Sequence, residues 1–284
     1  MAPKQTPGMT GSKPTKDERR EAAREKARLL REQEAKRAKR NRMLIIAAVV
    51  LVLALVVFAI VQITRQNNVA AASTANVGED YGISISTDGA ATTAAEGGAS
   101  EVAFYVDSTC PHCVELDNAA LDPVKAHIAA GDVQFKYYPV AIDPIGPQYH
   151  DQSQWGTTSE FYIASQAPEY FHAYHEALMN DQTGWFAQIS KSAQAGIAAP
   201  GTDVLGEIAR SAGVPEDVAS ALVDDVKTPT WMKVAEAATN AFRDGGFTGT
   251  PTVTLNGVVN ESYGGIDTAA ITTWLAGVAD GSIK

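Results

Sequence analysis

The longest apolar stretch of the chain lies near its N-terminus. Residues 43–61 are all apolar, and residues 62 and 63 extend the stretch without adding a charge. A helix rises about 1.5 Å per residue, so this segment would span roughly 30 Å, the thickness of the hydrocarbon core of a bilayer. The pattern therefore predicts a transmembrane helix over residues 43–63. A buried core helix is disfavoured because no polar face interrupts the run.

A polar stretch of low complexity follows this segment. Residues 67 to about 100 are rich in Ala, Gly, Thr, Ser and Asn, which predicts a flexible linker. Within this stretch, residues 81–86 (YGISIS) alternate enough to predict a first short strand. We expect the linker to occupy residues 64–79 and the folded domain to occupy residues 80–284.

A β-α-β unit is predicted next. Residues 102–106 (VAFYV) form a short β-rich apolar run, which is typical of a strand buried on both faces. A helix is expected to follow, because Ser108 or Thr109 can cap it and Pro111 suits its first turn. Residues 133–138 (VQFKYY) predict the next strand.

The middle of the chain is predicted to be helical. Apolar residues recur there at helical spacing, and Pro and Gly residues mark the ends of the rows. The rows are Tyr170, Tyr174 and Leu178; Val204, Leu205 and Ile208; Val218, Leu222 and Val226; and Trp231, Val234, Ala238 and Phe242. The mixed pattern then resumes, with strands at 252–255 and 258–259 joined by an Asn256-Gly257 turn, and a last helix after Asp267.

The charge distribution favours one orientation of the predicted membrane helix. Residues 1–42 contain 14 Lys+Arg and 6 Asp+Glu, whereas residues 43–284 contain 9 and 27. Basic residues directly before a membrane helix keep the N-terminus in the cytoplasm, which places everything after residue 64 outside. We interpret residues 1–42 as a solvated cytoplasmic segment that fixes the topology, in preference to a segment that binds nucleic acid or anionic lipid.

A cleaved signal peptide is the alternative interpretation of the N-terminal region. Ala70, Ala71 and Ala72 would then form the cleavage site. The apolar run exceeds the roughly 7 to 15 residues of a signal peptide, and the basic region before it is much longer than a signal's n-region. We therefore expect a single-pass cell-membrane protein whose C-terminal domain is extracytoplasmic.

The two cysteines of the chain, Cys110 and Cys113, form one C-x-x-C motif between the predicted strand and helix. Such a pair is expected of a thioredoxin-like redox centre. At a helix N-terminus the Cys110 sulfur would face unpaired backbone N–H groups and the positive end of the helix dipole, which lower the pKa of its thiol. His112 adds a donor or a positive charge beside it. A stabilised thiolate makes the disulfide a stronger oxidant.

With this motif, residues from about 80 to 284 resemble the DsbA-like branch of the thioredoxin superfamily. The dithiol of that family is C-P-H-C, as it is here. A second family mark, a cis-proline loop that faces the dithiol, is matched by Thr250 and Pro251 within the sequence GTPT. The resemblance implies an α/β thioredoxin-like fold with an inserted helical domain over about residues 150–244, which a single transmembrane helix precedes in this chain.

The resemblance also implies a role for each of these residues. Cys110 is expected to be the nucleophile that forms a mixed disulfide with a client protein, and Cys113 the buried resolving thiol. His112 would tune the thiolate, while Thr250 and Pro251 would shape the groove that holds the client's backbone. The sequence departs from the family at Phe104, where many relatives carry a buried carboxylate six residues before the first cysteine, so any proton relay must use another group, such as water.

The sequence therefore predicts a membrane-tethered thiol:disulfide oxidoreductase that donates disulfides to reduced exported proteins. The resemblance implies recharging by a membrane-embedded, quinone-linked thiol oxidase, and no cofactor or nucleic-acid partner is expected. A reductase or isomerase with the same fold is an alternative, and the redox potential decides between them.

Three other uses of the C-x-x-C motif are disfavoured. A zinc site completed by His172 and His175 would lack a second C-x-x-C. A static disulfide would close too short a loop to stabilise the fold much. A soft-metal carrier for Cu(I) would need thioether ligands, and Met179 and Met232 in the folded domain are not clustered in the sequence.

Overall fold

The computed structural model divides the chain into two compact units, Met1–Arg65 and Gln66–Lys284. Most of the second unit is described, and only isolated positions of the first. The described residues are 25, 28, 31, 36, 37, 39, 41, 43, 46, 51, 52, 74–93, 96–263 and 265–284.

The described positions of the first unit are all helical. The membrane helix predicted over residues 43–63 lies outside the described residues, apart from Met43, Ile46, Leu51 and Val52. Within the described part of the chain, no helix combines the length and the hydropathy needed to cross a bilayer.

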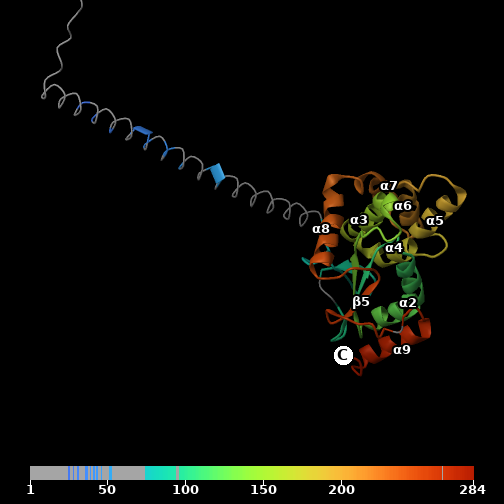
Figure 1. Ribbon diagram of the computed structural model, residues 1–284. Helices are drawn as coiled ribbons and strands as arrows, with labels where there is room; N and C mark the ends of the chain where they lie inside the picture. The colour runs from blue at the N-terminus through green and yellow to red at the C-terminus, as the bar shows by residue number, and fades with distance from the viewer. Residues whose placement is uncertain are drawn as a thin grey trace, which may run out of the picture. The chain divides into compact units, whose positions relative to one another are not determined.

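A mixed β-sheet forms the centre of the second unit (Figure 1). Its strand order is β2-β1-β4-β3-β5-β6; β3 and β4 are parallel, and the other neighbours are antiparallel. The strands are β1 (Ile83–Ile85), β2 (Ala91–Thr92), β3 (Glu101–Val106), β4 (Gln134–Pro139), β5 (Thr252–Leu255) and β6 (Val258–Val259). The predictions of β1, β3, β4, β5 and β6 are confirmed.

The prediction of a linker up to about residue 100 is wrong for the part that contains β2. Ala91 pairs with Ile85 of β1, and the Ser86 hydroxyl closes the intervening turn by accepting from the Ala90 N–H at 3.0 Å. This short hairpin is held by backbone pairing and by the side chains of Ser86 and Asp88, since Asp88 Oδ1 also accepts from the Ala90 N–H at 3.3 Å. Neither backbone pairing nor a local side-chain hydrogen bond is visible in a hydropathy pattern.

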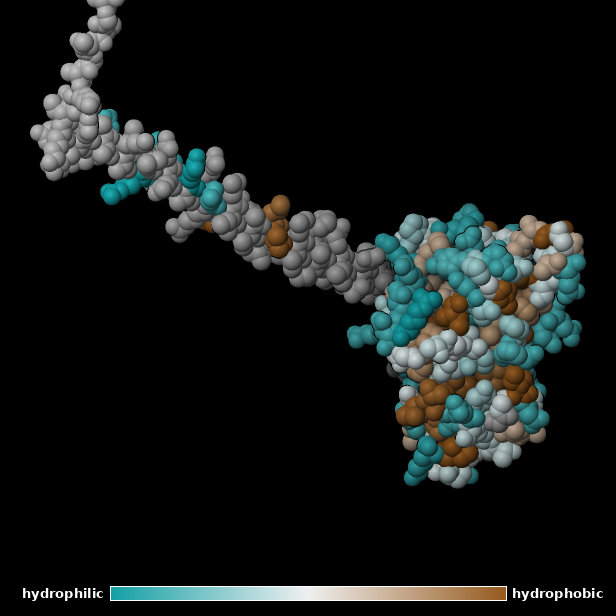
Figure 2. Space-filling model, viewed as in Figure 1, coloured by the Kyte–Doolittle hydropathy of each residue, from teal (hydrophilic) through white to brown (hydrophobic). Residues whose placement is uncertain are grey.

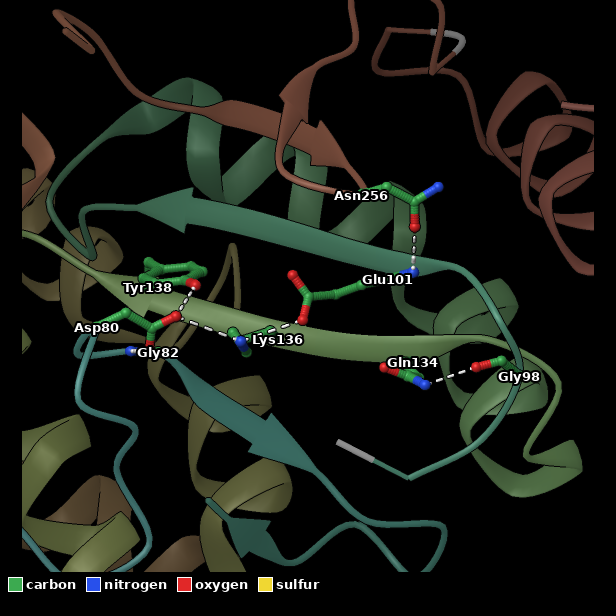
Figure 3. Close-up of polar contacts among 8 residues, drawn as sticks. All are labelled: Asp80, Gly82, Gly98, Glu101, Gln134, Lys136, Tyr138 and Asn256. Carbon is green, nitrogen blue, oxygen red and sulfur yellow. Dashed lines mark hydrogen bonds and ion pairs between the residues drawn. The ribbon is translucent and has the colours of Figure 1, made fainter. Parts of the chain in front are cut away.

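The β5–β6 hairpin turns where the Asn-Gly pair predicts it. Asn256 and Gly257 have φ angles of 53° and 77°, and both positive values are what a two-residue type I′ hairpin needs. The Asn256 side chain also accepts a hydrogen bond from the Glu101 N–H at 3.0 Å, which ties the turn to the start of β3 (Figure 3).

Polar contacts also fix the segment before β1 to the sheet (Figure 3). Asp80 accepts hydrogen bonds from the Tyr138 hydroxyl at 2.6 Å and from the Gly82 N–H at 3.1 Å. Lys136 of β4 lies 3.4 Å from Asp80 and 3.1 Å from Glu101 of β3. The ion pairs are partly exposed and each contributes little free energy, so their main effect is to fix geometry.

Helix α2 (Pro111–Ala130) connects β3 to β4 and completes the predicted β-α-β unit. It ends at Gly131, whose φ of 64° is the left-handed conformation that favours glycine at a helix C-terminus. Helix α9 (Thr268–Ala279) packs along α2 and begins at Asp267, which accepts from the Ala270 N–H at 2.8 Å. The predictions of both helices are confirmed.

A helical insertion lies between β4 and β5, as predicted. It contains η1 (Pro147–Tyr149), α3 (His150–Gln166), η2 (Pro168–Tyr170), α4 (Phe171–Leu178), α5 (Trp185–Ala195), α6 (Asp203–Ser211), α7 (Glu216–Asp225) and α8 (Pro229–Asp244). Figure 1 shows these helices gathered at one end of the folded unit, with α2 and α9 toward the other.

Helix α3 is hidden from the apolar pattern because its buried face is largely polar. Ser153, Thr157, Thr158, Ser159 and Glu160 are all fully buried. The Thr157 hydroxyl donates to the Val140 carbonyl at 2.9 Å, which satisfies one of these groups from the loop after β4. Hydrogen bonds of this kind let a polar helix occupy the core beside the sheet.

A buried charged network joins the insertion to α2. His175 of α4 contacts Glu160 of α3 through one ring nitrogen and Asp117 of α2 through the other, the latter at 3.1 Å. Burial alone would lower the pKa of His175, but the two carboxylates raise it to about 10. The imidazole therefore carries both protons at neutral pH and donates to both carboxylates, which fixes three helices relative to one another.

Candidate active site

The C-x-x-C motif begins helix α2. Cys110 is the N-cap residue, with an extended backbone, and Pro111 occupies the first turn. The Cys110 sulfur accepts a hydrogen bond from the Cys113 N–H at 3.4 Å. The prediction that Cys110 lies at a helix N-terminus is thus confirmed, but the predicted cap is wrong: the sulfur itself takes the place expected for the hydroxyl of Ser108 or Thr109.

The two thiols have opposite environments although they are three residues apart. Both are free and buried, with 2% of Cys110 and 0% of Cys113 exposed. A hydrogen bond from the Cys113 thiol, opposed by burial and assisted by Thr250, lowers the pKa of Cys110 to about 6. Burial, together with Cys110, raises the pKa of Cys113 well above its ordinary value. At neutral pH the pair therefore holds a thiolate at Cys110 and a thiol at Cys113.

The loop that carries Thr250 and Pro251 faces the dithiol, as predicted. The Thr250-Pro251 peptide bond is cis, and the Cys110 thiol lies 3.4 Å from the Thr250 carbonyl oxygen. The Thr250 hydroxyl is buried and has no regular hydrogen-bond partner among the described residues. It is nevertheless close enough to lower the pKa of both thiols.

An aromatic cluster anchors this loop to the sheet. The ring of Phe247, three residues before Thr250, lies 4.8 Å from that of Tyr105 on β3 and 5.4 Å from that of Phe242 on α8. The aromatic contacts hold one end of the loop, and β5 begins at its other end. Thr250 is thereby fixed from both sides.

His112 points away from the buried part of the site. Its side chain is 71% exposed, and its Nδ1 lies 3.1 Å from Glu115. No hydrogen bond joins it to either cysteine in the described part of the chain. Any tuning of the thiolate by His112 therefore acts through space, in competition with the charge of Glu115.

Sequence reasoning missed Asp107, which lies directly behind the dithiol. Its side chain is fully buried, and its Oδ1 accepts from the Thr109 N–H at 2.8 Å and from the Thr109 hydroxyl at 2.7 Å. Its Oδ2 accepts from the Ser153 hydroxyl at 2.6 Å and from the Ile142 N–H at 2.9 Å. A charged residue directly after a strand predicted to be buried on both faces was the available signal. Phe104, by contrast, packs in the core, with its ring 5.8 Å from that of Tyr137.

A glycine on α3 lets the active-site loop approach that helix. A Cβ atom at Gly156 would lie 2.0 Å from the Ser108 hydroxyl oxygen and 3.1 Å from the Trp185 ring. Any larger residue would displace the loop that carries Cys110. The insertion is therefore in direct contact with the loop that carries the dithiol.

The histidines considered for a zinc site are engaged elsewhere. Both ring nitrogens of His175 face carboxylates, and His172 lies 3.2 Å from Glu176. Met179, considered as a thioether ligand, is fully buried in the core. Among the described residues, no group of three or more His, Cys, Asp or Glu side chains is arranged to hold a metal ion.

The Thr250 hydroxyl gives a test of this geometry. We expect Thr250→Val to raise the pKa of Cys110, because the substitution removes a group that lowers it while nearly preserving volume. Thiolate absorbance near 240 nm, titrated against pH, measures the change. Thr252→Val is the matched control, since that hydroxyl instead donates to the Gly249 carbonyl at 2.7 Å. Equal midpoints for Thr250→Val and the unmodified protein would show that the Thr250 hydroxyl does not act on the Cys110 thiolate.

Comparison with known proteins supports the fold. A model of the family described as "Thioredoxin" matches residues 95–270. The solved structure of MdbA, a thiol-disulfide oxidoreductase from Actinomyces oris, is similar with a TM-score of 0.56 and 16% identity over 74% of this chain and 89% of that chain. At that identity the likeness shows the fold alone.

Two further solved structures are similar at lower TM-scores. BdbD from Bacillus subtilis, in its oxidised form, has a TM-score of 0.49 and 16% identity over 66% of this chain and 92% of its own. The reduced disulfide bond oxidoreductase DsbG from Mycobacterium tuberculosis has a TM-score of 0.45 and 25% identity over 57% of this chain and 71% of its own. No curated protein sequence matches the chain. Because the family model covers more than half of its length, the chain belongs to the thioredoxin family.

Proposed function

We propose that this chain is a DsbA-like thiol:disulfide oxidoreductase that donates a Cys110–Cys113 disulfide to exported proteins. The observation that carries the proposal is the position of Cys110 at the N-cap of α2, where its sulfur accepts the Cys113 N–H, above a fully buried Cys113. The pKa of Cys110 is lowered to about 6, while that of Cys113 is raised well above its ordinary value. Stabilising the Cys110 thiolate favours the reduced form, and this makes the disulfide a stronger oxidant.

In the proposed reaction, a client thiolate attacks the Cys110 sulfur of the disulfide. The Cys110–Cys113 bond breaks, a mixed disulfide between client and Cys110 forms, and Cys113 leaves and takes up a proton. A second client thiolate then attacks the client sulfur of the mixed disulfide, and Cys110 leaves as a thiolate. Two electrons pass to the protein, and the client gains a disulfide. The low pKa of Cys110 makes it a good leaving group in the second step.

The client segment would bind beside the loop of Thr250 and Pro251. Cys110 is only 2% exposed, so a client must lie against this loop to reach the sulfur. The edge strand β6, which pairs with β5, exposes Val258 by 70% and Val259 by 49%. Figure 2 shows apolar surface in the lower part of the folded unit. An unfolded client offers apolar side chains and unpaired backbone groups that match such an edge.

Each turnover leaves the protein reduced, so an oxidant must restore the disulfide. We propose that a membrane-embedded, quinone-linked thiol oxidase removes the two electrons. His112 would tune the Cys110 thiolate in both half-reactions from its exposed position at the start of α2.

The ionisation of the thiols argues against the alternatives. A reductase is favoured by a less stable reduced form, whereas the lowered pKa of Cys110 stabilises the reduced form. A Cu(I) carrier needs both sulfurs as thiolates. The raised pKa of Cys113 opposes formation of the second thiolate.

The division of labour between the cysteines can be tested by trapping. Cys113→Ser should accumulate mixed disulfides with client proteins, because its Cys110 thiolate can still attack a client disulfide and release a client thiolate, while no Cys113 thiol is present to attack the Cys110 sulfur and break the mixed disulfide. Non-reducing gel electrophoresis followed by mass spectrometry detects these species. Cys110→Ser is the matched control and should trap none. Trapping by Cys110→Ser instead would reverse the assigned roles.

A reduced-RNase assay tests the direction of electron flow with the same proteins. The unmodified oxidised chain should restore RNase activity from reduced RNase, and both serine variants should fail. Rapid insulin reduction without RNase oxidation would support the reductase alternative.

We also propose that the catalytic unit is extracytoplasmic and tethered by a membrane helix over residues 43–63. The proposal rests on the apolar run and on the excess of basic residues before it. Protease added to intact cells should remove the catalytic unit and leave residues 1–42 protected. A soluble, released form that begins at Ser73 would instead support the signal-peptide alternative.

A further inference from the structure

The strongest unassigned feature of the site is the buried carboxylate of Asp107. It lies three residues before Cys110, with 0% of its surface exposed. Four donors surround its two oxygens: the N–H and hydroxyl of Thr109, the hydroxyl of Ser153 and the N–H of Ile142. Two of these donors are backbone N–H groups, which can donate a hydrogen bond but cannot accept one from a protonated carboxyl group. The pocket is therefore built for an anion, although burial raises the pKa of Asp107.

These hydrogen bonds join three separate parts of the fold. Thr109 belongs to the turn that leads into α2, Ile142 to the loop after β4, and Ser153 to α3 of the insertion. The same turn is closed by the Cys110 N–H, which donates to the Asp107 carbonyl at 2.9 Å. The position of the Cys110 sulfur over the helix N-terminus thus depends on Asp107 through both its backbone and its side chain.

Other ionisable groups surround this carboxylate. On the α2 side stands Cys110, whose pKa the Asp107 charge raises, with Cys113 buried below it. On the α3 side stands Glu160, whose pKa Asp107 also raises. The imidazolium of His175 is held between Glu160 and Asp117. In this group of described residues the carboxylates outnumber the single imidazolium, so the charge of Asp107 is not cancelled locally.

We propose that Asp107 is a positioning residue that holds the Cys110 turn in place and whose negative charge opposes the Cys110 thiolate, so that it limits the oxidising strength of the dithiol. Reduction of the disulfide takes two electrons and one proton and yields one thiolate and one thiol. The thiolate adds a second negative charge beside Asp107, whereas the disulfide adds none. The carboxylate therefore destabilises the reduced form relative to the disulfide. The consequence for clients rests on the proposed function, but the effect on the sulfur does not.

The neutral variant Asp107→Asn tests the charge in the full-length chain. It should lower the Cys110 titration midpoint, read from thiolate absorbance near 240 nm, and shift the equilibrium with glutathione toward the reduced protein. Asp122→Asn is the matched control, because it removes the same charge from an exposed position of α2. A midpoint that stays unchanged or rises in Asp107→Asn, with circular dichroism like that of the unmodified chain, would overturn the proposal.

A second measurement needs no substitution at Asp107 and applies even if the variant does not fold. Coupling between two charges is reciprocal, so the Cys110 thiolate must raise the pKa of Asp107. Carbon-13 NMR of Asp107 in the oxidised and reduced protein should show a higher midpoint in the reduced state, and Cys110→Ser should abolish the rise. Equal midpoints in both redox states would overturn the proposal. Because neither measurement involves a client, failure of the trapping experiment would refute the proposed function and leave this inference standing.

Discussion

The active site depends on one interaction, the hydrogen bond that the Cys113 N–H donates to the Cys110 sulfur at the start of α2. A helix N-terminus leaves backbone N–H groups without partners, and a thiolate satisfies them better than a thiol does. The same helix turn buries Cys113 below the first sulfur. One local geometry thus separates the two thiols into a stabilised anion and a neutral group, which is the asymmetry that thiol exchange needs.

The rest of the folded unit holds that geometry from three sides. The loop of Thr250, anchored by the aromatic contacts of Phe247, covers the Cys110 sulfur. Helix α3 supports the turn from behind, through the hydrogen bond of Ser153 and the close approach that Gly156 permits. The insertion is therefore part of the active-site scaffold.

Sequence reasoning recovered the features that a short pattern encodes. The C-P-H-C motif, the Thr250-Pro251 loop and the Asn256-Gly257 turn each combine residue types that only a few structures accommodate. It missed β2, and within the predicted helical insertion it found no apolar row for α3, because their stability comes from backbone pairing and from buried polar groups such as Thr157 rather than from apolar periodicity. It missed Asp107 for a related reason: the donors that make its burial possible come from residues up to 46 positions away in the chain.

The redox potential of the Cys110–Cys113 pair tests the central claim most directly. Equilibrium with glutathione buffers, read by the fraction of protein in the disulfide form, measures it. Because the lowered pKa of Cys110 stabilises the reduced form, the potential should lie above the roughly −270 mV of thioredoxin, in the direction of the roughly −120 mV of DsbA. A potential at or below about −270 mV would show that the reduced form is not stabilised, and it would contradict the assignment of this dithiol as a disulfide donor.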